Sequence, residues 1–170
     1  MKLAKSFFTD EQQKKVKESI ENAEAQTSGE IVVHLDDKCD EDVMDRAAYI
    51  FDFLNLQKTK HRNGVLFYIS IEDHKFAILG DAGINAVVEE GFWDTTRDIV
   101  ISNFKEGEYE KGLSRGIEEA GRRLKEHFPF TEDTRDELSN DISFGKNESK
   151  WKPYTFWSEP WQSHLHSSFQ

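Results

Sequence analysis

The chain has 170 residues, 36% of them hydrophobic, which is enough for one core of ordinary size and predicts a single domain. Its 33 acidic residues outnumber its 22 basic residues, and the net charge of -11 argues against nucleic-acid binding, because that function needs a cationic face. We therefore expect divalent cations or a protein as partners, no nucleic acid, and a monomer.

No segment supplies the roughly 18 consecutive apolar residues of a membrane span, and no apolar stretch typical of a signal peptide follows the basic start of the chain. Cys39 is the single cysteine, so the chain can form neither an internal disulfide nor a cysteine-based zinc site. These features predict a protein that is neither secreted nor membrane-bound, and they favour the reducing cytoplasm.

Helical and strand patterns alternate along the first half of the chain. Thr9 and Gln12 have the spacing of a capping box, and the apolar residues behind them predict a helix over 10–25. The short β-branched run over 30–35 predicts a buried strand. Apolar residues at three-and-four spacing over 43–54 then predict an amphipathic helix that returns the chain across the sheet.

The nearly apolar run over 64–71 predicts a central strand covered on both faces, and 76–80 follows it as the second strand of a hairpin. Helical spacing resumes from Ile84, continues over 93–104, and indicates a last long helix over 109–127. If strand 64–71 runs parallel to the first strand and its hairpin partner returns antiparallel, these elements form a mixed sheet.

The chain changes character beyond Pro129. Residues 131–150 are polar and acidic, and we predict an irregular segment there. Residues 151–170 hold three of the four tryptophans without a usable period, which we interpret as an appended or vector-derived peptide. The predicted organisation is one domain over 1–130 and an irregular tail over 131–170.

Gly112-Leu113-Ser114-Arg115-Gly116 has the Gly-x-Ser-x-Gly spacing of a hydrolase nucleophile elbow. That elbow needs a sharp turn from a strand into a helix, whereas this match lies inside a predicted helix. We interpret Gly112 and Gly116, one helical turn apart, as positions that let the helix approach the sheet closely.

The histidines show no spacing typical of metal ligands, so we interpret them as surface or structural residues. A compact basic loop contains Lys58, Lys60, His61 and Arg62. Two interpretations of this loop stay open: it binds a substrate anion, or it is simply solvated.

The carboxylates indicate more about function than the histidines do, and the predicted topology assigns them to the two ends of the sheet. One end of the sheet gathers Glu30, His61, Arg62, Asn63 and Asp81. The other end gathers Asp36, Asp37, Glu72 and Asp73. After a short helix come three acids that could fold back over the first end: Glu89, Glu90 and Asp94. Because Ca²⁺ and Mg²⁺ take oxygen ligands, that end is a candidate cation site, with solvated surface acids as the alternative.

Between Phe8 and Pro129 a series of short motifs follows in order: Leu54-Asn55-Leu56, Arg62-Asn63-Gly64-Val65-Leu66, Gly80-Asp81 with Gly83-Ile84, Trp93, Phe104 with Gly107, Tyr109 with Gly112-Leu113, and His127-Phe128-Pro129. This series resembles the cytosolic branch of the TPM domain family. The resemblance implies an α/β fold in which a mixed β-sheet is sandwiched between helices (α/β/α), with an acidic cleft. It also implies calcium or magnesium binding and weak acid phosphatase activity, each known for some members.

Many members of the family carry a Gly-Leu-Glu-Gly segment followed by an acidic residue. Gly83 and Ile84 match the first half of this segment, Asn85 stands at the glutamate position, and the later acid falls on Glu90. A neutral amide contributes less to cation affinity than a carboxylate does. This departure reduces the cation affinity that the resemblance implies.

Two functions follow as hypotheses. The first is a divalent-cation-binding domain with Asp81, Glu89, Glu90 and Asp94 as metal ligands; slow phosphomonoesterase chemistry would extend it, with Asn63, Arg62 and Asp81 as candidate catalytic residues. The second is a non-enzymatic protein-binding or adaptor module that uses its acidic face or the segment after Pro129. The second hypothesis is supported by the lack of a coherent set of nucleophile, base and oxyanion hole in the sequence.

Overall fold

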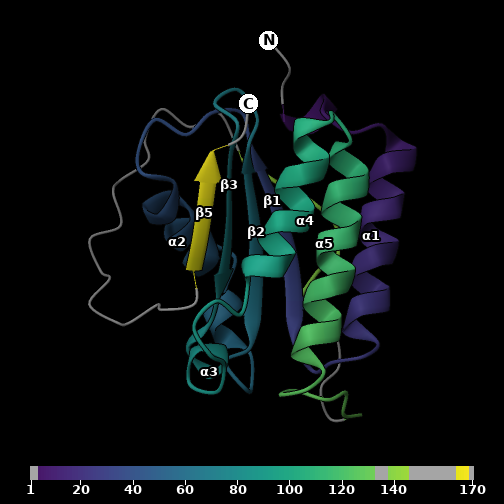
Figure 1. Ribbon diagram of the computed structural model, residues 1–170, viewed down its shortest axis with the longest axis vertical. Helices are drawn as coiled ribbons and strands as arrows, with labels where there is room; N and C mark the ends of the chain where they lie inside the picture. Colours follow the sequence, from purple (N-terminus) through teal and green to yellow (C-terminus); the bar gives the residue numbers. More distant parts are fainter. Residues whose placement is uncertain (1–3, 133–137, 146–163, 169–170) are drawn as a thin grey trace.

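The computed structural model describes residues 4–132, 138–145 and 164–168. One sheet with strand order β4-β1-β2-β3-β5 lies between two layers of helices, which confirms the predicted α/β/α fold (Figure 1). The strands are β1 (Glu30–Asp36), β2 (Gly64–Ser70), β3 (Lys75–Gly80), β4 (Ser143–Phe144) and β5 (His164–Ser168). The α-helices are α1 (Asp10–Glu24), α2 (Val43–Phe53), α3 (Ala82–Asn85), α4 (Asp94–Lys105) and α5 (Tyr109–Leu124), and the short 3₁₀ helices are η1 (Ala4–Ser6) and η2 (Leu56–Lys58).

The sheet is mixed, as predicted. Strands β1 and β2 run parallel with Glu30 opposite Gly64, because α2 carries the chain back along one face of the sheet between them. Strand β3 returns antiparallel to β2, and just beyond its end the backbone N–H of Asp81 donates to the carbonyl of Gly64 (3.0 Å). Asn63, which precedes β2, and Asp81, which follows β3, therefore lie at the same end of the sheet.

Both faces of the central strands are covered, and every residue of β1 and β2 is buried. Helices α1, α4 and α5 cover one face of the sheet, and α2 covers the other (Figure 1). Ile31 and Phe67 belong to the core with residues of α1, α4 and α5, whereas Val32 and Leu66 belong to the core with residues of α2. This is why the strands are nearly continuous apolar runs instead of alternating patterns. Polar side chains at their ends lie away from water and need partners inside the protein.

Local sequence signals account for the helix ends. The Thr9 side chain accepts from the N–H of Gln12 (3.1 Å), and the Gln12 side chain accepts from the N–H of Thr9 (2.9 Å), which confirms the capping box. Asp42 caps α2 in a similar way, by accepting from the N–H of Met44 (2.9 Å). None of the helices in the described part of the chain combines the length and the hydrophobicity that a membrane span needs.

The C-terminal part of the chain differs from the predicted irregular tail. Ser143 and Phe144 form β4, which pairs parallel with β1 at His34 and Leu35. Residues 164–168 form β5, which pairs antiparallel with β3. The open edges of the sheet supply pairing partners that the local pattern does not reveal. The tryptophans of the tail lie outside the described residues, so the interpretation of an appended peptide stays a prediction.

The Gly-x-Ser-x-Gly match lies inside α5, as predicted, but its glycines face mainly α4. A Cβ atom at Gly112 would lie 2.7 Å from the Cβ of Asn103, and one at Gly116 would overlap the side chain of Val100. Phe67 of the sheet lies farther from that second position, at 3.6 Å. The expectation of a close approach to the sheet is therefore corrected: the glycines chiefly set the spacing between two helices.

Gly112→Ala should lower the free energy of unfolding by about 1–3 kcal/mol, because the added methyl group forces Asn103 or the backbone of α4 to move. Ser114→Ala is the matched control, since the Ser114 hydroxyl donates to Glu110 one turn away (3.1 Å) on the outer part of the helix. We expect a change below about 0.5 kcal/mol for the control. Urea unfolding measures both, and equal stabilities for the two variants would contradict a close contact between α4 and α5.

Candidate functional site

Asp81 lies at the point where β3 ends and α3 begins. Its carboxylate caps α3 by accepting from the N–H of Ala82 (2.6 Å), and its side chain is fully buried. Its own N–H is held by Gly64 of the neighbouring strand. The strand and the short helix therefore fix this carboxylate in one position.

Arg62 supplies the positive charge that the buried carboxylate needs. Its Nε donates to Oδ2 of Asp81 and its Nη2 donates to Oδ1, both at 2.8 Å, in a bidentate pair. The Arg62 side chain is 49% exposed, whereas that of Asp81 is 0% exposed. The backbone of Arg62 has a left-handed φ of 51°, and its carbonyl accepts from the N–H of Gly83 (2.8 Å). The loop before β2 and the start of α3 are thus joined by both backbone and side chain.

Asn63 is at the same end of the sheet but has a structural role. Its side-chain amide donates to the hydroxyl of Ser28 (3.1 Å), and its backbone N–H donates to the hydroxyl of Thr59 (3.1 Å). Its carbonyl accepts from the N–H of Glu30 (3.4 Å). Asn63 is buried and ties the start of β2 to the segment that precedes β1.

Glu89 and Glu90 lie in the turn between α3 and α4, Asp94 is the first residue of α4, and all three are exposed. The turn is held by a hydrogen bond from the N–H of Asp94 to the carbonyl of Gly91 (3.0 Å), and Gly91 has a φ of 81°. Buried Trp93 anchors the turn against the end of β3. The buried aromatic residue therefore fixes the backbone, while the acidic side chains stay at the surface.

The predicted site residues are thus divided between two environments. Arg62, Asn63 and Asp81 meet at one end of the sheet as predicted, and each is engaged with other groups of the protein. Glu89, Glu90 and Asp94 follow Asp81 by 8 to 13 residues in the sequence, and they lie on the surface. Among residues 4–132, 138–145 and 164–168, no group of three or more histidine, cysteine, aspartate or glutamate side chains is arranged to hold a metal ion.

The opposite end of the sheet holds a second buried aspartate, Asp36. Its carboxylate accepts from Nε of Arg46 (2.7 Å) and from the hydroxyl of Tyr68 (2.7 Å), and it lies 2.9 Å from Nε2 of His34. Gly145 closes this network, because a Cβ atom there would overlap the Asp36 carboxylate. The network is therefore sealed between β1, β2, α2 and the residue after β4.

The pKa values at this end indicate a structural network. Burial alone would raise the pKa of Asp36, but hydrogen bonds and charges from His34 and Arg46 outweigh burial and hold that pKa well below its usual range. Burial, together with the Asp36 carboxylate, raises the pKa of Tyr68 far above its ordinary value. Burial raises the pKa of Cys39 to about 11. The phenol and the thiol therefore stay protonated at neutral pH, and neither is an activated nucleophile.

Asp36 lies at the end of the sheet where the sequence pattern predicts it, and His34 is a buried, structural histidine. Arg46 and Tyr68 were not among the predicted residues. Arg46 lies in the first turns of the helix that follows β1, so a basic residue at that position was a possible signal for a partner of Asp36. The partnership of Tyr68 depends on the parallel register of β1 and β2, which the pattern of one strand does not contain.

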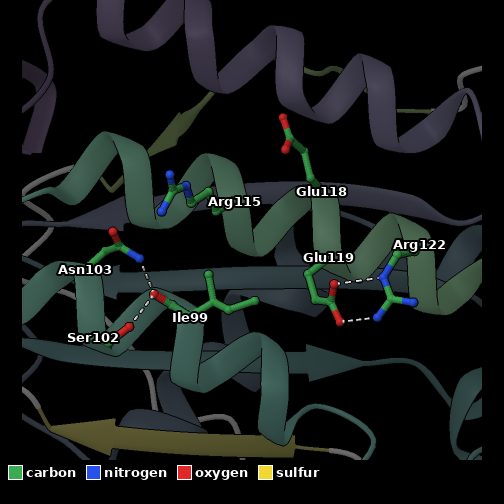
Figure 2. Close-up of a pocket in the computed structure, with 7 residues that line it drawn as sticks. All are labelled: Ile99, Ser102, Asn103, Arg115, Glu118, Glu119 and Arg122. Atoms are coloured by element: carbon green, nitrogen blue, oxygen red, sulfur yellow. Dashed lines mark hydrogen bonds and ion pairs between the residues drawn. The ribbon is translucent and has the colours of Figure 1, made fainter.

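An open groove of about 570 Å³ runs between α4 and α5 (Figure 2). Glu119 and Arg122 form an ion pair along it (2.7 Å), and Arg115 and Glu118 are exposed beside that pair. Charges of both signs therefore alternate along the groove. This balance gives the groove no preference for a cation or an anion, and it is not the candidate ion site.

The family comparison covers the part of the chain that contains the Asp81 end of the sheet. A model of the TPM domain matches residues 3–123. The chain belongs to the TPM domain family. Its matched region includes β1, β2, β3 and nearly all of α5, so the TPM domain contributes both the Arg62–Asp81 pair and the acidic turn.

Two solved structures resemble this TPM domain. The NMR structure of the BA42 protein from the psychrophilic bacterium Bizionia argentinensis is 47% identical, with a TM-score of 0.80, and the match covers 85% of this chain and 100% of BA42. The solution NMR structure of the N-terminal domain of a protein from P. gingivalis is 18% identical, with a TM-score of 0.59 over 71% of this chain and 78% of that one. The second likeness concerns the fold alone. No protein with a curated description matches the chain.

Asp36→Asn should lower the free energy of unfolding of this TPM domain by about 3–5 kcal/mol at neutral pH, because it leaves the Arg46 guanidinium without its buried counter-charge. Because the folded-state pKa of Asp36 is depressed, its contribution is fully present above the unfolded value of about 4 and is lost as the pH falls below it. The variant should therefore lose less stability than the wild type when the pH is lowered through that range.

Urea unfolding at a series of pH values measures this difference. Asp40→Asn is the matched control, since it removes one exposed carboxylate that pairs with Lys38 at the surface (2.9 Å). The control should change stability by less than about 1 kcal/mol. An acid dependence in Asp36→Asn as steep as that of the wild type would contradict the role assigned to the network.

Proposed function

We propose that this TPM domain binds a divalent cation, Ca²⁺ or Mg²⁺, through the turn between α3 and α4. One observation carries the proposal: Glu89 and Glu90 in the turn and Asp94 at the start of α4 are exposed, and none of them has an ion-pair partner among the described residues. Exposed carboxylates that follow one another closely in the sequence attract a cation, because each cation contact relieves their mutual repulsion.

The ligand chemistry favours oxygen-seeking cations of modest affinity. The turn offers carboxylate oxygens, and water would complete the coordination shell. Ca²⁺ accepts about six to eight oxygen ligands in flexible geometry, whereas Mg²⁺ demands a near-ideal octahedron and gives up its water reluctantly. An irregular surface turn therefore suits Ca²⁺ better. Asn85, which stands where many family members have a glutamate, removes one charge and favours weak binding.

The overall charge of the protein supports the same function. With 33 acidic and 22 basic residues, the chain has a net charge of -11, which raises the local concentration of divalent cations at its surface. This long-range term depends on ionic strength, since surface charges are screened over about 8 Å at physiological salt. Specific binding at the turn therefore has to be measured at constant ionic strength.

A titration with CaCl₂, followed by the amide resonances of the ¹⁵N-labelled protein, should shift the residues of the 89–94 turn in a saturable way. Glu89→Gln/Glu90→Gln should weaken the apparent affinity by about tenfold, because it removes two of the three charges that the cation contacts. Glu18→Gln/Glu21→Gln is the matched control, since it removes the same charge from an exposed part of α1. The control should bind as the wild type does.

Two results would contradict cation binding at the turn. In one, no amide resonance of the 89–94 turn moves at millimolar Ca²⁺ or Mg²⁺. In the other, the two double variants lose affinity equally, which would show that the cation senses only the net charge of the protein. MgCl₂ in place of CaCl₂ measures the preference for Ca²⁺ that the irregular turn leads us to expect.

The proposal does not extend to phosphomonoester hydrolysis. Asp81 is held by Arg62, and the Asn63 amide is held by Ser28, so these candidate catalytic residues already serve other groups of the protein. With p-nitrophenyl phosphate and saturating Mg²⁺, we expect turnover at the background rate. Steady turnover that Asp81→Asn abolishes would contradict this expectation, and it would also exclude the alternative of a purely non-enzymatic binding module.

A further inference from the structure

We propose that the Ser143 hydroxyl is an activated nucleophile that takes up acyl groups from small carboxylic esters, with His34 as its general base and Asp36 as the residue that orients His34. Oγ of Ser143 lies 2.9 Å from Nδ1 of His34, and Nε2 of His34 lies 2.9 Å from Oδ1 of Asp36. A hydroxyl, an imidazole and a carboxylate in this order are the arrangement that activates the serine of many hydrolases. The site lies at the Asp36 end of the sheet and does not depend on cation binding at the acidic turn.

The pairing of the strands brings the three side chains together. His34 and Asp36 are two residues apart on β1, so their side chains point to the same face of the sheet. The parallel register of β4 sets Ser143 opposite His34, on that same face. On its other side, His34 is opposite Tyr68 of β2, and the two rings stack with their centroids 6.0 Å apart and their planes 10° apart. The imidazole is therefore held in place between β4 and β2.

The charge of Asp36 determines the direction of the hydrogen bonds. Although burial would raise the pKa of Asp36, hydrogen bonds from His34 and Arg46 keep this carboxylate ionised at neutral pH. An ionised carboxylate only accepts hydrogen bonds, so Nε2 of a neutral His34 carries the proton, and Nδ1 is left with a lone pair. The Ser143 hydroxyl therefore donates to Nδ1 of His34, which is the direction that general-base activation needs.

Ser143 combines this buried support with partial access to solvent. His34 and Asp36 are buried, whereas Ser143 is half-buried. In the described part of the chain, β4 is the last strand on its side of the sheet, next to β1. The N–H of Gly145 donates to the carbonyl of Leu35 (2.8 Å) and fastens the end of β4. An ester that approaches this edge of the sheet therefore meets the Ser143 hydroxyl without opening the core.

The acyl transfer needs only the ester and water as co-reactants. Oγ of Ser143 attacks the ester carbonyl, and its proton moves to Nδ1 of His34. The bond between the carbonyl carbon and the alcohol oxygen then breaks, and the departing alcohol takes the proton from Nδ1. Water attacks the acyl-serine in the same way, which releases the carboxylic acid and restores the hydroxyl. Asp36 stays ionised throughout and stabilises the imidazolium of His34.

Phenylmethanesulfonyl fluoride is a suitable probe, because Oγ displaces fluoride from its sulfur and forms a stable ester. The full chain is incubated with this probe at neutral pH, and peptide mass spectrometry locates and quantifies the modified serines. Ser114 is the internal control, since its hydroxyl donates to the carboxylate of Glu110 (3.1 Å). We expect Ser143 to react at least about tenfold faster than Ser114, because a neighbouring base removes its proton.

Variants separate activation from a structural role. His34→Gln keeps a donor for Asp36 and an acceptor for Ser143 but has no base, so modification of Ser143 should slow by about a hundredfold. His127→Gln removes an exposed imidazole and is the matched control, with an unchanged rate at Ser143. With p-nitrophenyl acetate, the wild type should release p-nitrophenolate faster than Ser143→Ala does, and it should carry an acetyl group on Ser143.

Two results would overturn the inference. In one, Ser143 reacts with the sulfonyl fluoride no faster than Ser114, or neither reacts. In the other, folded His34→Gln is modified at Ser143 as fast as the wild type. Either result would show that the hydrogen bond between Ser143 and His34 only fastens β4 to β1.

If His34→Gln does not fold, the pH dependence of the wild type decides. The charged and titratable groups around the His34 ring are Asp36 on its own strand, Tyr68 on β2 and Arg46 on α2. The reaction rate of Ser143 relative to that of Ser114 should fall toward acidic pH, because a protonated imidazole accepts no proton from the hydroxyl. A ratio that stays constant with pH overturns the inference.

Discussion

Burial of β1 and β2 on both faces is the constraint on which the rest of this structure depends. Water does not reach the strands, so each charged group at their ends needs a counter-charge inside the protein. Two aspartates meet this need in the same way: Asp36 pairs with Arg46 at one end, and Asp81 pairs with Arg62 at the other. The sheet is thus bounded at both ends by a buried carboxylate and an arginine.

The two ends of the sheet differ in how much of the paired arginine contacts solvent. At the Asp36 end, the Arg46 side chain is only 14% exposed, and Tyr68, His34 and Gly145 complete the enclosure. Its groups hold their charges and protons inside the protein. At the Asp81 end, about half of the Arg62 side chain is exposed to solvent. The acidic turn follows α3, a few residues after Asp81 in the sequence. The paired arginine therefore contacts solvent at the Asp81 end and is mostly enclosed at the Asp36 end.

Much of the fold and part of the site could be predicted from local patterns. Local patterns predicted the capping box at Thr9, the apolar strands β1 and β2, and the hairpin to β3. The two strand pairings together place Asn63 and Asp81 at the same end of the sheet. The sequence did not predict that Arg62 is the partner of Asp81, because both a metal ion and an arginine supply the positive charge that a buried carboxylate needs. The sequence also did not predict the exposure of Glu89, since that exposure depends on how buried Trp93 anchors the turn.

The sequence by itself determined the elements whose signals are local: helix caps, strand runs covered on both faces, and the order of motifs that indicates a TPM domain. The tertiary structure alone decided which segments meet. It added β4 and β5 to the sheet edges, turned Gly112 toward α4, and set Arg62 against Asp81. The physical reason is range, because caps and periodicity act within a few residues, whereas edge pairing and charge pairing depend on groups that only folding brings together.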